Sequence, residues 1–334
     1  MSQRAPDFLG PAPAYRPAWW LPGGHLQTIG SSFAPRPVVA YRRERLVAPD
    51  GDDWDFDWVD ARANHAGAAA PLLVLFHGLE GGSGSHYARS VMDFASSLGW
   101  RGVIPHFRGC GGELNRRPRA YHSGDHEEVG AMLGAIRARI DAGTPVHAVG
   151  VSLGGSALVN WLGRAGADAR GVLDSAAAVS TPLDLTAAGI AIGQGLNRIY
   201  TRYFLSTLVP KGIAMARRFP GTLDEPAIRR VRSMHDFDDC VTAPLHGFAG
   251  ADDYWRRASA KPWLAAVAIP TLVLNARNDP FIPAESLPRG DAVSRSVLLE
   301  QPENGGHAGF VAGPFPGNHG WLPRRLLDFF LRGR

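Results

Sequence analysis

The sequence predicts an α/β protein in which a doubly wound, mostly parallel sheet follows an N-terminal antiparallel hairpin and carries an inserted helical cap. Short, continuous apolar runs recur along the chain, helical periodicity fills the intervals between them, and one early segment alternates apolar and acidic residues. A repeated strand, helix, strand order with right-handed crossovers produces a doubly wound sheet. We expect one domain over residues 1–334, because α/β units often reach this length.

The alternating segment is WDFDWV, residues 54–59, where three aromatic residues alternate with Asp55 and Asp57. A period of two predicts a half-buried strand. An Asp-Gly turn at residues 50–51 separates it from RERLVA, residues 43–48. The two segments are therefore predicted to pair as an antiparallel hairpin.

Six apolar runs predict the strands of the parallel sheet, because runs that are apolar on both faces are typical of strands covered on both sides. They are LLVLF (72–76), GVIPHF (102–107), VHAVGV (146–151), AAAVS (176–180), TLVLNA (271–276) and SVLLE (296–300). The interval between the fourth and fifth runs is much longer than one crossover requires. Roughly residues 184–262 are therefore predicted to form the inserted helical cap.

A helix is predicted between the second and third runs. Its apolar residues at positions 129, 132, 133, 136 and 140 share one stripe. Asp125 and Glu128 have the spacing of a capping box at its start, and Gly143 and Pro145 predict its end.

Composition and charge narrow the class of protein. Hydrophobic residues are 45% and charged residues 20% of the chain, as in ordinary globular proteins. Cys110 and Cys240 are too few for a disulfide framework and favour a reducing, cytoplasmic compartment. The N-terminus lacks the apolar core of a secretion signal, and no segment has the roughly 20 apolar residues of a membrane span. A formal charge of +4 permits weak peripheral attraction to anionic surfaces, and the scattered arginines argue against nucleic acid as a partner.

The stretch AVGVSLGGSAL, residues 148–158, places Ser152 between Gly150 and Gly154, after one predicted strand and before a predicted helix. G-x-S-x-G in this context predicts a nucleophile elbow, in which the serine occupies a strained turn and the glycines prevent clashes. A flexible glycine-rich turn is the alternative, and the flanking strand and helix favour the elbow. The hydroxyl of Ser152 would then lie at the C-terminal edge of the sheet, near the positive end of a helix.

A serine hydroxyl is a weak nucleophile, so the elbow requires a histidine base and an orienting carboxylate, in the chain order Ser, Asp, His. Asp279 follows TLVLNA in an Asp-Pro turn, and His307 follows SVLLE in a glycine-rich loop. Each alone could be an ordinary turn or surface residue, but their ordered occurrence after Ser152 favours a triad. Asp184, just after AAAVS, is the competing acid, and we prefer Asp279.

The amides of Leu79 and Leu153 are the predicted oxyanion hole, because one donor should follow the nucleophile and the other should come from the loop after an earlier strand. Leu79 lies in HGLEGGSGS, directly after LLVLF. This stretch lacks the Gly-Lys-Ser/Thr ending of a P-loop, and a dinucleotide fingerprint fits no better. His77 in the same loop is interpreted as a structural hydrogen-bonding residue rather than a second base.

No metal ion and no other cofactor are predicted. His122 and His126 are four residues apart, but Gly124 breaks any helix that would align them, and no H-E-x-x-H occurs. Cys110 lies near the predicted site without triad-like partners of its own, and we interpret it as a small buried residue.

Six segments carry a resemblance to a known family. They are HLQTI (25–29), HGLEGGSGSHY (77–87), HFRGCGGELNRRPRAYHSGD (106–125), GVSLGG (150–155), RNDPF (277–281) and NGGHAGF (304–310). This set resembles the YheT-type α/β-hydrolases, a bacterial branch of a wider esterase and lipase family. The resemblance implies an α/β-hydrolase fold, a triad of Ser152, Asp279 and His307, and a carboxylic-ester hydrolase activity. Family members often have Asn where this chain has Ser156.

The same resemblance implies a small-molecule acyl ester as substrate and a place in lipid metabolism, because eukaryotic relatives act on medium-chain acyl esters that include glycerolipid-type substrates. Arg108 could attract an anionic head group, and an internal salt bridge with Glu113 or Asp125 is favoured instead. Two other functions stay open. An acyltransferase would pass the acyl group to an alcohol or thiol, and a ligand-binding protein on the same fold would show no turnover.

Overall fold

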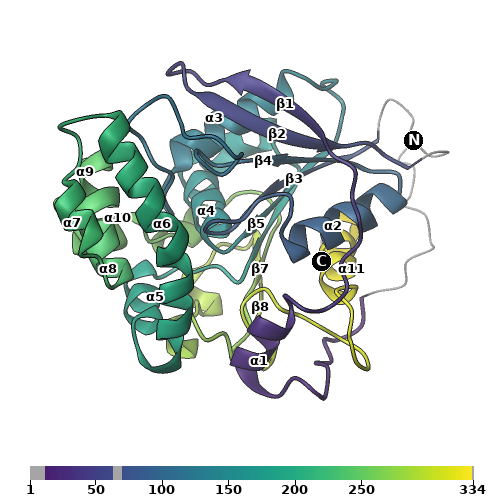
Figure 1. Cartoon of the computed structure of the whole chain (residues 1–334). Helices are drawn as coiled ribbons and strands as arrows, with labels where there is room; N and C mark the ends of the chain where they lie inside the picture. The colour runs from purple at the N-terminus through teal and green to yellow at the C-terminus, as the bar shows by residue number, and fades with distance from the viewer. Residues whose placement is uncertain (1–11, 63–69, 333–334) are drawn as a thin grey trace.

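A computed structural model describes residues 12–62 and 70–332 of the chain and has one eight-stranded sheet at its centre (Figure 1). The strand order is β1-β2-β4-β3-β5-β6-β7-β8. β2 pairs antiparallel with both β1 and β4, and the other neighbours are parallel, which confirms the predicted hairpin and mostly parallel sheet. The strands are β1 (Arg42–Val47), β2 (Asp53–Val59), β3 (Leu72–Phe76), β4 (Arg101–Pro105), β5 (Val146–Val151), β6 (Ser175–Val179), β7 (Thr271–Leu274) and β8 (Val297–Glu300).

Helices cover both faces of this sheet (Figure 1). In β3, Leu72, Val74 and Phe76 belong to the core formed with α3 and α4, whereas Leu73 and Leu75 belong to the core formed with α2 and α11. A strand that is buried on both faces has no polar positions, which is why its sequence is continuously apolar. The covering helices are α2 (His86–Ser97), α3 (His126–Arg137), α4 (Leu153–Ala165) and α11 (Trp321–Arg332).

β8 differs from the other predicted parallel strands. It is the edge strand, and its side chains are half-buried or exposed rather than covered on both sides. The expectation that all six apolar runs are covered on both sides is therefore wrong for this edge strand.

β2 is buried on both faces, although its alternating sequence predicted a half-buried strand. Arg45 Nε lies 2.8 Å from Asp55 Oδ1, and Arg43 Nε lies 2.7 Å from Asp57 Oδ1. Burial by itself would raise the pKa of Asp57, but hydrogen bonds from Arg43 and His106 hold that pKa below its ordinary value. Charged partners from β1 thus replace water on the acidic face of this strand.

α3 is shorter than predicted, and it begins with a single N-cap hydrogen bond instead of the predicted capping box. It ends at Arg137, so Ile140 lies beyond it. The side chain of Asp125 accepts a hydrogen bond from the amide of Glu128, as an N-cap does. The carboxylate of Glu128 does not complete a capping box, because the guanidinium of Arg108 binds it, with Nε 2.7 Å from Oε1.

Arg108 forms the internal salt bridge that the sequence favoured, but with other partners than the two expected carboxylates. Besides Glu128, its Nη1 lies 2.8 Å from carboxylate oxygens of both Asp50 and Asp52. The cluster joins the turn between β1 and β2 to α3.

Six α-helices lie between β6 and β7, at the left of Figure 1. They are α5 (Leu185–Ile192), α6 (Arg198–Arg218), α7 (Glu225–Arg229), α8 (Met234–Phe237), α9 (Ala243–His246) and α10 (Ala251–Ala258). Leu208, Ile228, Phe237 and Val241 give this segment an apolar cluster of its own. Its action as a cap over residues 184–262 stays a prediction.

α1 (Gly23–Gly30) precedes the sheet and was not predicted as a helix. Residues 1–11, which include part of the segment in which no secretion signal was expected, lie outside the described residues. Within the described ranges, no helix is long and apolar enough to cross a bilayer.

Candidate active site

Ser152 occupies the turn between β5 and α4, with φ 80° and ψ −115°. Residues other than glycine rarely adopt positive φ, and such a conformation costs on the order of 1–3 kcal/mol. The amide of Ser152 donates to the carbonyl of Val179 at 3.0 Å, which ties the turn to the neighbouring strand β6. The strained backbone presents the hydroxyl at the carboxyl edge of the sheet.

Gly150 and Gly154 leave room for this turn. A Cβ atom on Gly150 would lie 2.5 Å from the carbonyl oxygen of Gly154, and one on Gly154 would clash with the carbonyl oxygens of Phe76 and His77 at the end of β3. A side chain at either position would push α4 away from the sheet.

His307 connects Ser152 to Asp279. Its Nε2 lies 2.8 Å from Ser152 Oγ, and its Nδ1 lies 2.8 Å from Asp279 Oδ2. The Asp279 carboxylate is fully buried, and its other oxygen accepts a hydrogen bond from the amide of Phe281 at 2.8 Å. Because an ionised carboxylate only accepts, Nδ1 carries the proton and Nε2 is free to accept one from the serine.

Asp184, the competing acid, is not part of this chain of hydrogen bonds. It is the N-cap of α5, where its Oδ1 accepts from the amide of Ala187 at 3.0 Å.

A buried glutamine from α1 supports the loop that carries His307. Oε1 of Gln27 accepts hydrogen bonds from the amide of Gly305 at 2.8 Å and from Nδ2 of Asn278 at 3.0 Å. Its Nε2 donates to Oδ1 of Asn304 at 3.3 Å. Gln27 therefore holds together the loop after β7, which carries Asp279, and the loop after β8, which carries His307.

Two further hydrogen bonds fix the backbone at His307. The amide of His307 donates to Oγ1 of Thr28 at 2.9 Å, and the amide of Gly306 donates to Oδ1 of Asn278 at 3.0 Å. The sequence analysis assigned no role to Gln27, Thr28 or Asn278. The one signal was that all three are polar residues inside the resembling segments HLQTI and RNDPF.

The turn after β3 leaves one amide beside Ser152 without a protein acceptor. The amide of Gly78 donates to the Tyr87 hydroxyl at 2.9 Å, and that of Glu80 donates to the Tyr121 hydroxyl at 2.9 Å. Within the described part of the chain, the amide of Leu79 between them has no such partner. The amide of Leu153 begins α4 and likewise has no acceptor inside its helix.

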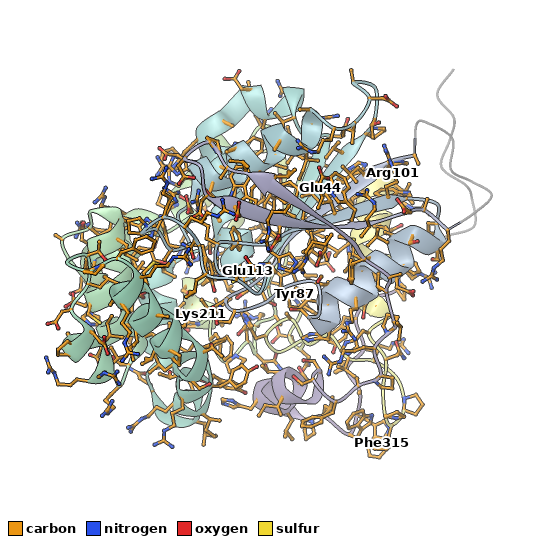
Figure 2. All side chains as sticks on the ribbon, turned by 45° about the horizontal axis from the view of Figure 1, so that its top comes forward. Glu44, Tyr87, Arg101, Glu113, Lys211 and Phe315 are labelled. Carbon is orange, nitrogen blue, oxygen red and sulfur yellow. The ribbon has the colours of Figure 1, made fainter. Side chains whose placement is uncertain are left out.

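Glu80 ties this turn to α6. Lys211 Nζ lies 2.8 Å from Glu80 Oε1, and the Tyr121 hydroxyl donates to the same oxygen at 2.9 Å. Lys211 lies at the boundary between the helices and the sheet (Figure 2). The ion pair fixes the Leu79 turn relative to the helices between β6 and β7.

His77 is a structural residue, as interpreted from the sequence. Its Nδ1 lies 2.8 Å from the carbonyl of Gly78, and its Nε2 accepts from the amide of Phe107 at 3.1 Å. Burial lowers the pKa of His77 to about 3, so the ring is neutral. Burial also raises the pKa of the Cys110 thiol to about 12, which keeps that side chain protonated.

The described residues contain no group of three or more His, Cys, Asp or Glu side chains arranged to hold a metal ion. His122 contacts the ring of His246, with ring centroids 4.4 Å apart.

Two hollows meet at Ser152 and His307. The inner cavity, of about 160 Å³, lies between the turn at Ser152 and the helices that follow β6. Its apolar lining includes Leu79, Leu153, Ile192, Leu208, Met215, Phe237 and Val241. The outer groove, of about 870 Å³, lies between α1, the turn after β3 and α6. Its lining includes Ile29, Phe33, Arg36, Ser85, His86, Ile199, Tyr200 and Tyr203.

Residues 71–314 match the family model described as alpha/beta hydrolase fold. The chain is 39% identical over 310 residues to the Escherichia coli (strain K12) protein called "Putative esterase YheT". The aligned region covers 91% of this chain and 89% of that protein. It is 31% identical over 321 residues to the phospholipase ABHD3 of Mus musculus, and this aligned region covers 94% of this chain and 77% of that protein.

Solved structures share the fold at low sequence identity. An acylaminoacyl peptidase of Pyrococcus horikoshii superposes with a TM-score of 0.54 at 14% identity, over 89% of this chain and 42% of that chain. The Pyrococcus furiosus esterase Pf2001 superposes with a TM-score of 0.51 at 15% identity, over 82% of this chain and 90% of that chain. At these identities the likeness concerns the fold alone.

Proposed function

Because this chain belongs to the alpha/beta hydrolase fold family, we propose that it is a serine hydrolase that cleaves carboxylic acid esters through an acyl-enzyme on Ser152. The observation that carries the proposal is the pair of 2.8 Å hydrogen bonds that link Ser152 to His307 and His307 to Asp279. This order of groups is the arrangement by which a serine hydroxyl is activated.

In the acylation step, Ser152 Oγ bonds to the acyl carbon while Nε2 of His307 takes the hydroxyl proton. The resulting imidazolium is stabilised by the buried carboxylate of Asp279. It then gives its proton to the oxygen of the departing alcohol as the carbon–oxygen bond of the ester breaks. The acyl group stays on Ser152.

In the deacylation step, His307 takes a proton from water as the water oxygen attacks the acyl carbon, and Ser152 recovers its proton as the acid leaves. Each step passes through a tetrahedral oxyanion. We assign its donors to the amides of Leu79 and Leu153, two residues that line the same cavity as Ser152 and whose amides have no protein acceptor among the described residues. The steps need no cofactor.

The substrate we propose is a short- to medium-chain acyl ester derived from a lipid. An apolar inner cavity beside Ser152 suits the acyl chain, and a larger outer groove on the other side of His307 suits the alcohol portion. The relatives named as an esterase and a phospholipase support this substrate class. In this proposal the helices of residues 184–262 are the cap that closes the inner cavity.

The experiment replaces the nucleophile and a second serine of the same segment. Ser152→Ala should lower kcat on p-nitrophenyl butyrate by at least about 10⁴-fold and abolish labelling by a fluorophosphonate probe. Ser156→Ala is the matched control, because Ser156 is buried in α4 and its hydroxyl donates to the carbonyl of Pro182. It should be labelled like the wild type, and the adduct should be found on Ser152 by mass spectrometry.

Three outcomes would replace the proposal. Labelling of Ser152→Ala at the wild-type rate would put the nucleophile elsewhere. Absence of turnover on a panel of esters of graded chain length would favour a ligand-binding protein. If an added alcohol captures the acyl group faster than water does, the chain is an acyltransferase that uses the same serine. A cytoplasmic location, inferred from the low cysteine content, stays a prediction.

A further inference from the structure

Two helical segments expose apolar side chains in the same pattern. Each carries three of them at positions i, i+3 and i+7, a spacing that puts all three on one side of a helix. All six are between 40% and 80% exposed, although side chains of this size are usually buried. The first set is Leu26, Ile29 and Phe33, on α1 and the turn after it, and the second is Leu196, Ile199 and Tyr203, on the start of α6 and the turn before it.

The two sets border one opening. Ile29 and Phe33 line the outer groove from one side, and Ile199 and Tyr203 line it from the other. The same groove reaches Ser152. We call these six apolar residues, together with Arg36, Arg198 and Arg202, the rim.

α1 and α6 are held next to each other. The ring of His25 stacks on that of Tyr200 with centroids 5.9 Å apart, and Nδ1 of His25 lies 3.2 Å from the Tyr200 hydroxyl. In Figure 1, α1 and α5 lie at the lower end of the molecule, away from β1, and α6 lies directly above α5. The two exposed stripes therefore belong to one continuous surface.

The charged side chains of the rim are all positive. The chain has 31 acidic residues, yet none lies between Asp7 and Glu44 or between Asp184 and Asp224, the two stretches that contain the rim. Arg198 and Arg202 are exposed, and no carboxylate of the described residues forms a salt bridge with either. Their i, i+4 spacing places them in a row beside the Ile199–Tyr203 stripe.

We propose that the rim docks on the surface of an anionic lipid bilayer. Exposed apolar side chains next to unpaired arginines are the pattern that binds such a surface, with the apolar groups in the acyl boundary and the guanidinium groups on lipid phosphates. A second copy of this chain fits less well, because two positively charged rims would repel each other. Docked in this way, the outer groove opens onto the lipid, so an acyl ester reaches Ser152 without crossing water.

The test measures co-sedimentation with two kinds of vesicle, one of phosphatidylcholine alone and one containing about one third phosphatidylglycerol. The wild type should bind the anionic vesicles and release from them in high salt. Arg198→Gln with Arg202→Gln should weaken this binding by about fivefold per arginine. Phe33→Ser with Ile199→Ser and Tyr203→Ser should weaken it at least as much. The measurement is repeated with Ser152→Ala, so that it does not depend on the proposed ester hydrolysis.

Control variants remove positive charges or an apolar side chain from surfaces outside the rim. Arg164→Gln with Arg170→Gln removes two charges at and just beyond the far end of α4, about 20 Å from the carboxyl edge of the sheet. Val47→Ser removes an exposed apolar side chain from β1, on the opposite side of the molecule from α1 (Figure 1). Both controls should bind like the wild type, and circular dichroism melting confirms that each variant is folded.

Four results would overturn the proposal. The first is no binding of the wild type to anionic vesicles. The second is equal loss of binding in the rim variants and the matched controls. The third is equal binding to both kinds of vesicle, which would remove the role of the arginines. If the rim variants instead turn a dimer into a monomer in sedimentation and leave vesicle binding unchanged, the rim is a contact between copies of the chain.

Discussion

The side chain of Gln27 accepts a hydrogen bond from the backbone amide of Gly305 at 2.8 Å, although 278 positions separate the two residues. Gln27 is also almost completely buried, so its carboxamide has no access to water as a substitute partner. The position of the loop that carries His307 therefore depends on a residue near the start of the chain.

Gln27→Ala should lower kcat by about 10- to 100-fold with little change in KM, because a small displacement of His307 weakens proton transfer without removing the substrate cavity. The buried amide and carboxamide groups left without partners should also destabilise the fold, by about 1–3 kcal/mol. Activity is compared below the melting temperature of the variant. The exposed Gln194→Ala is the control, and equal losses of kcat in the two variants would contradict the positioning role.

Asp279→Asn should lower kcat by about 10⁴-fold while the protein keeps its stability within about 1 kcal/mol, because the amide holds His307 in the wrong tautomer. Asp184→Asn is the matched change at the competing acid and should cost only part of an N-cap interaction, about 1 kcal/mol or less. Hydrolysis of p-nitrophenyl butyrate checks both. If Asp184→Asn is the more damaging of the two, Asp184 and not Asp279 orients the histidine.

Two glycines give opposite predictions for the same substitution. Gly154→Ala should lower the melting temperature by several degrees, because its methyl group would clash with the carbonyls of Phe76 and His77. Gly134→Ala should raise it slightly, by the equivalent of about 0.5–1 kcal/mol, because a Cβ there meets nothing within 4 Å and Gly134 lies inside α3. Thermal melting of the pair tests whether close packing, and not loss of glycine as such, requires Gly154.

Asp238 should make stability depend on pH. Burial raises its pKa to about 6, even though Thr242 and Trp255 both donate hydrogen bonds to it. Since the pKa in the folded chain exceeds the ordinary value of 3.8, the stabilisation by the protonated form is complete below pH 4 and is lost as pH rises through 6. Asp238→Asn stays neutral, so its gain in stability over the wild type should grow between pH 4 and 7, up to about 3 kcal/mol.

Chemical denaturation at several pH values measures this gain. The exposed Asp291→Asn is the control and should differ from the wild type by the same small amount at every pH. If the gain in stability from Asp238→Asn does not change between pH 5 and pH 7, burial does not raise the pKa of Asp238 in the folded chain.

The parallel sheet and the meeting of Ser152, Asp279 and His307 could be predicted because both depend on local patterns. Each of the three residues follows an apolar strand, and the carboxyl ends of parallel strands meet at one edge of the sheet. The partners of Arg108 could not be predicted in this way. Several carboxylates were within plausible reach, and only the packed fold decides that Glu128 binds the arginine instead of completing a capping box.

The burial of β2 was mispredicted for a related reason. Alternation shows which side chains share a face, but not what covers that face. Here arginines of β1 neutralise Asp55 and Asp57, so an acidic row that would ordinarily face water is enclosed. Gln27 was overlooked because its contacts join parts of the chain that no sequence window contains together.

The contact between Gln27 and Gly305 also has a consequence for biosynthesis. Residues 23–30 leave the ribosome well before their partners at 304–307. A nascent chain can assemble most of its strands while it still lacks His307, so the proposed chemistry at Ser152 can begin only after residues 304–307 have been made.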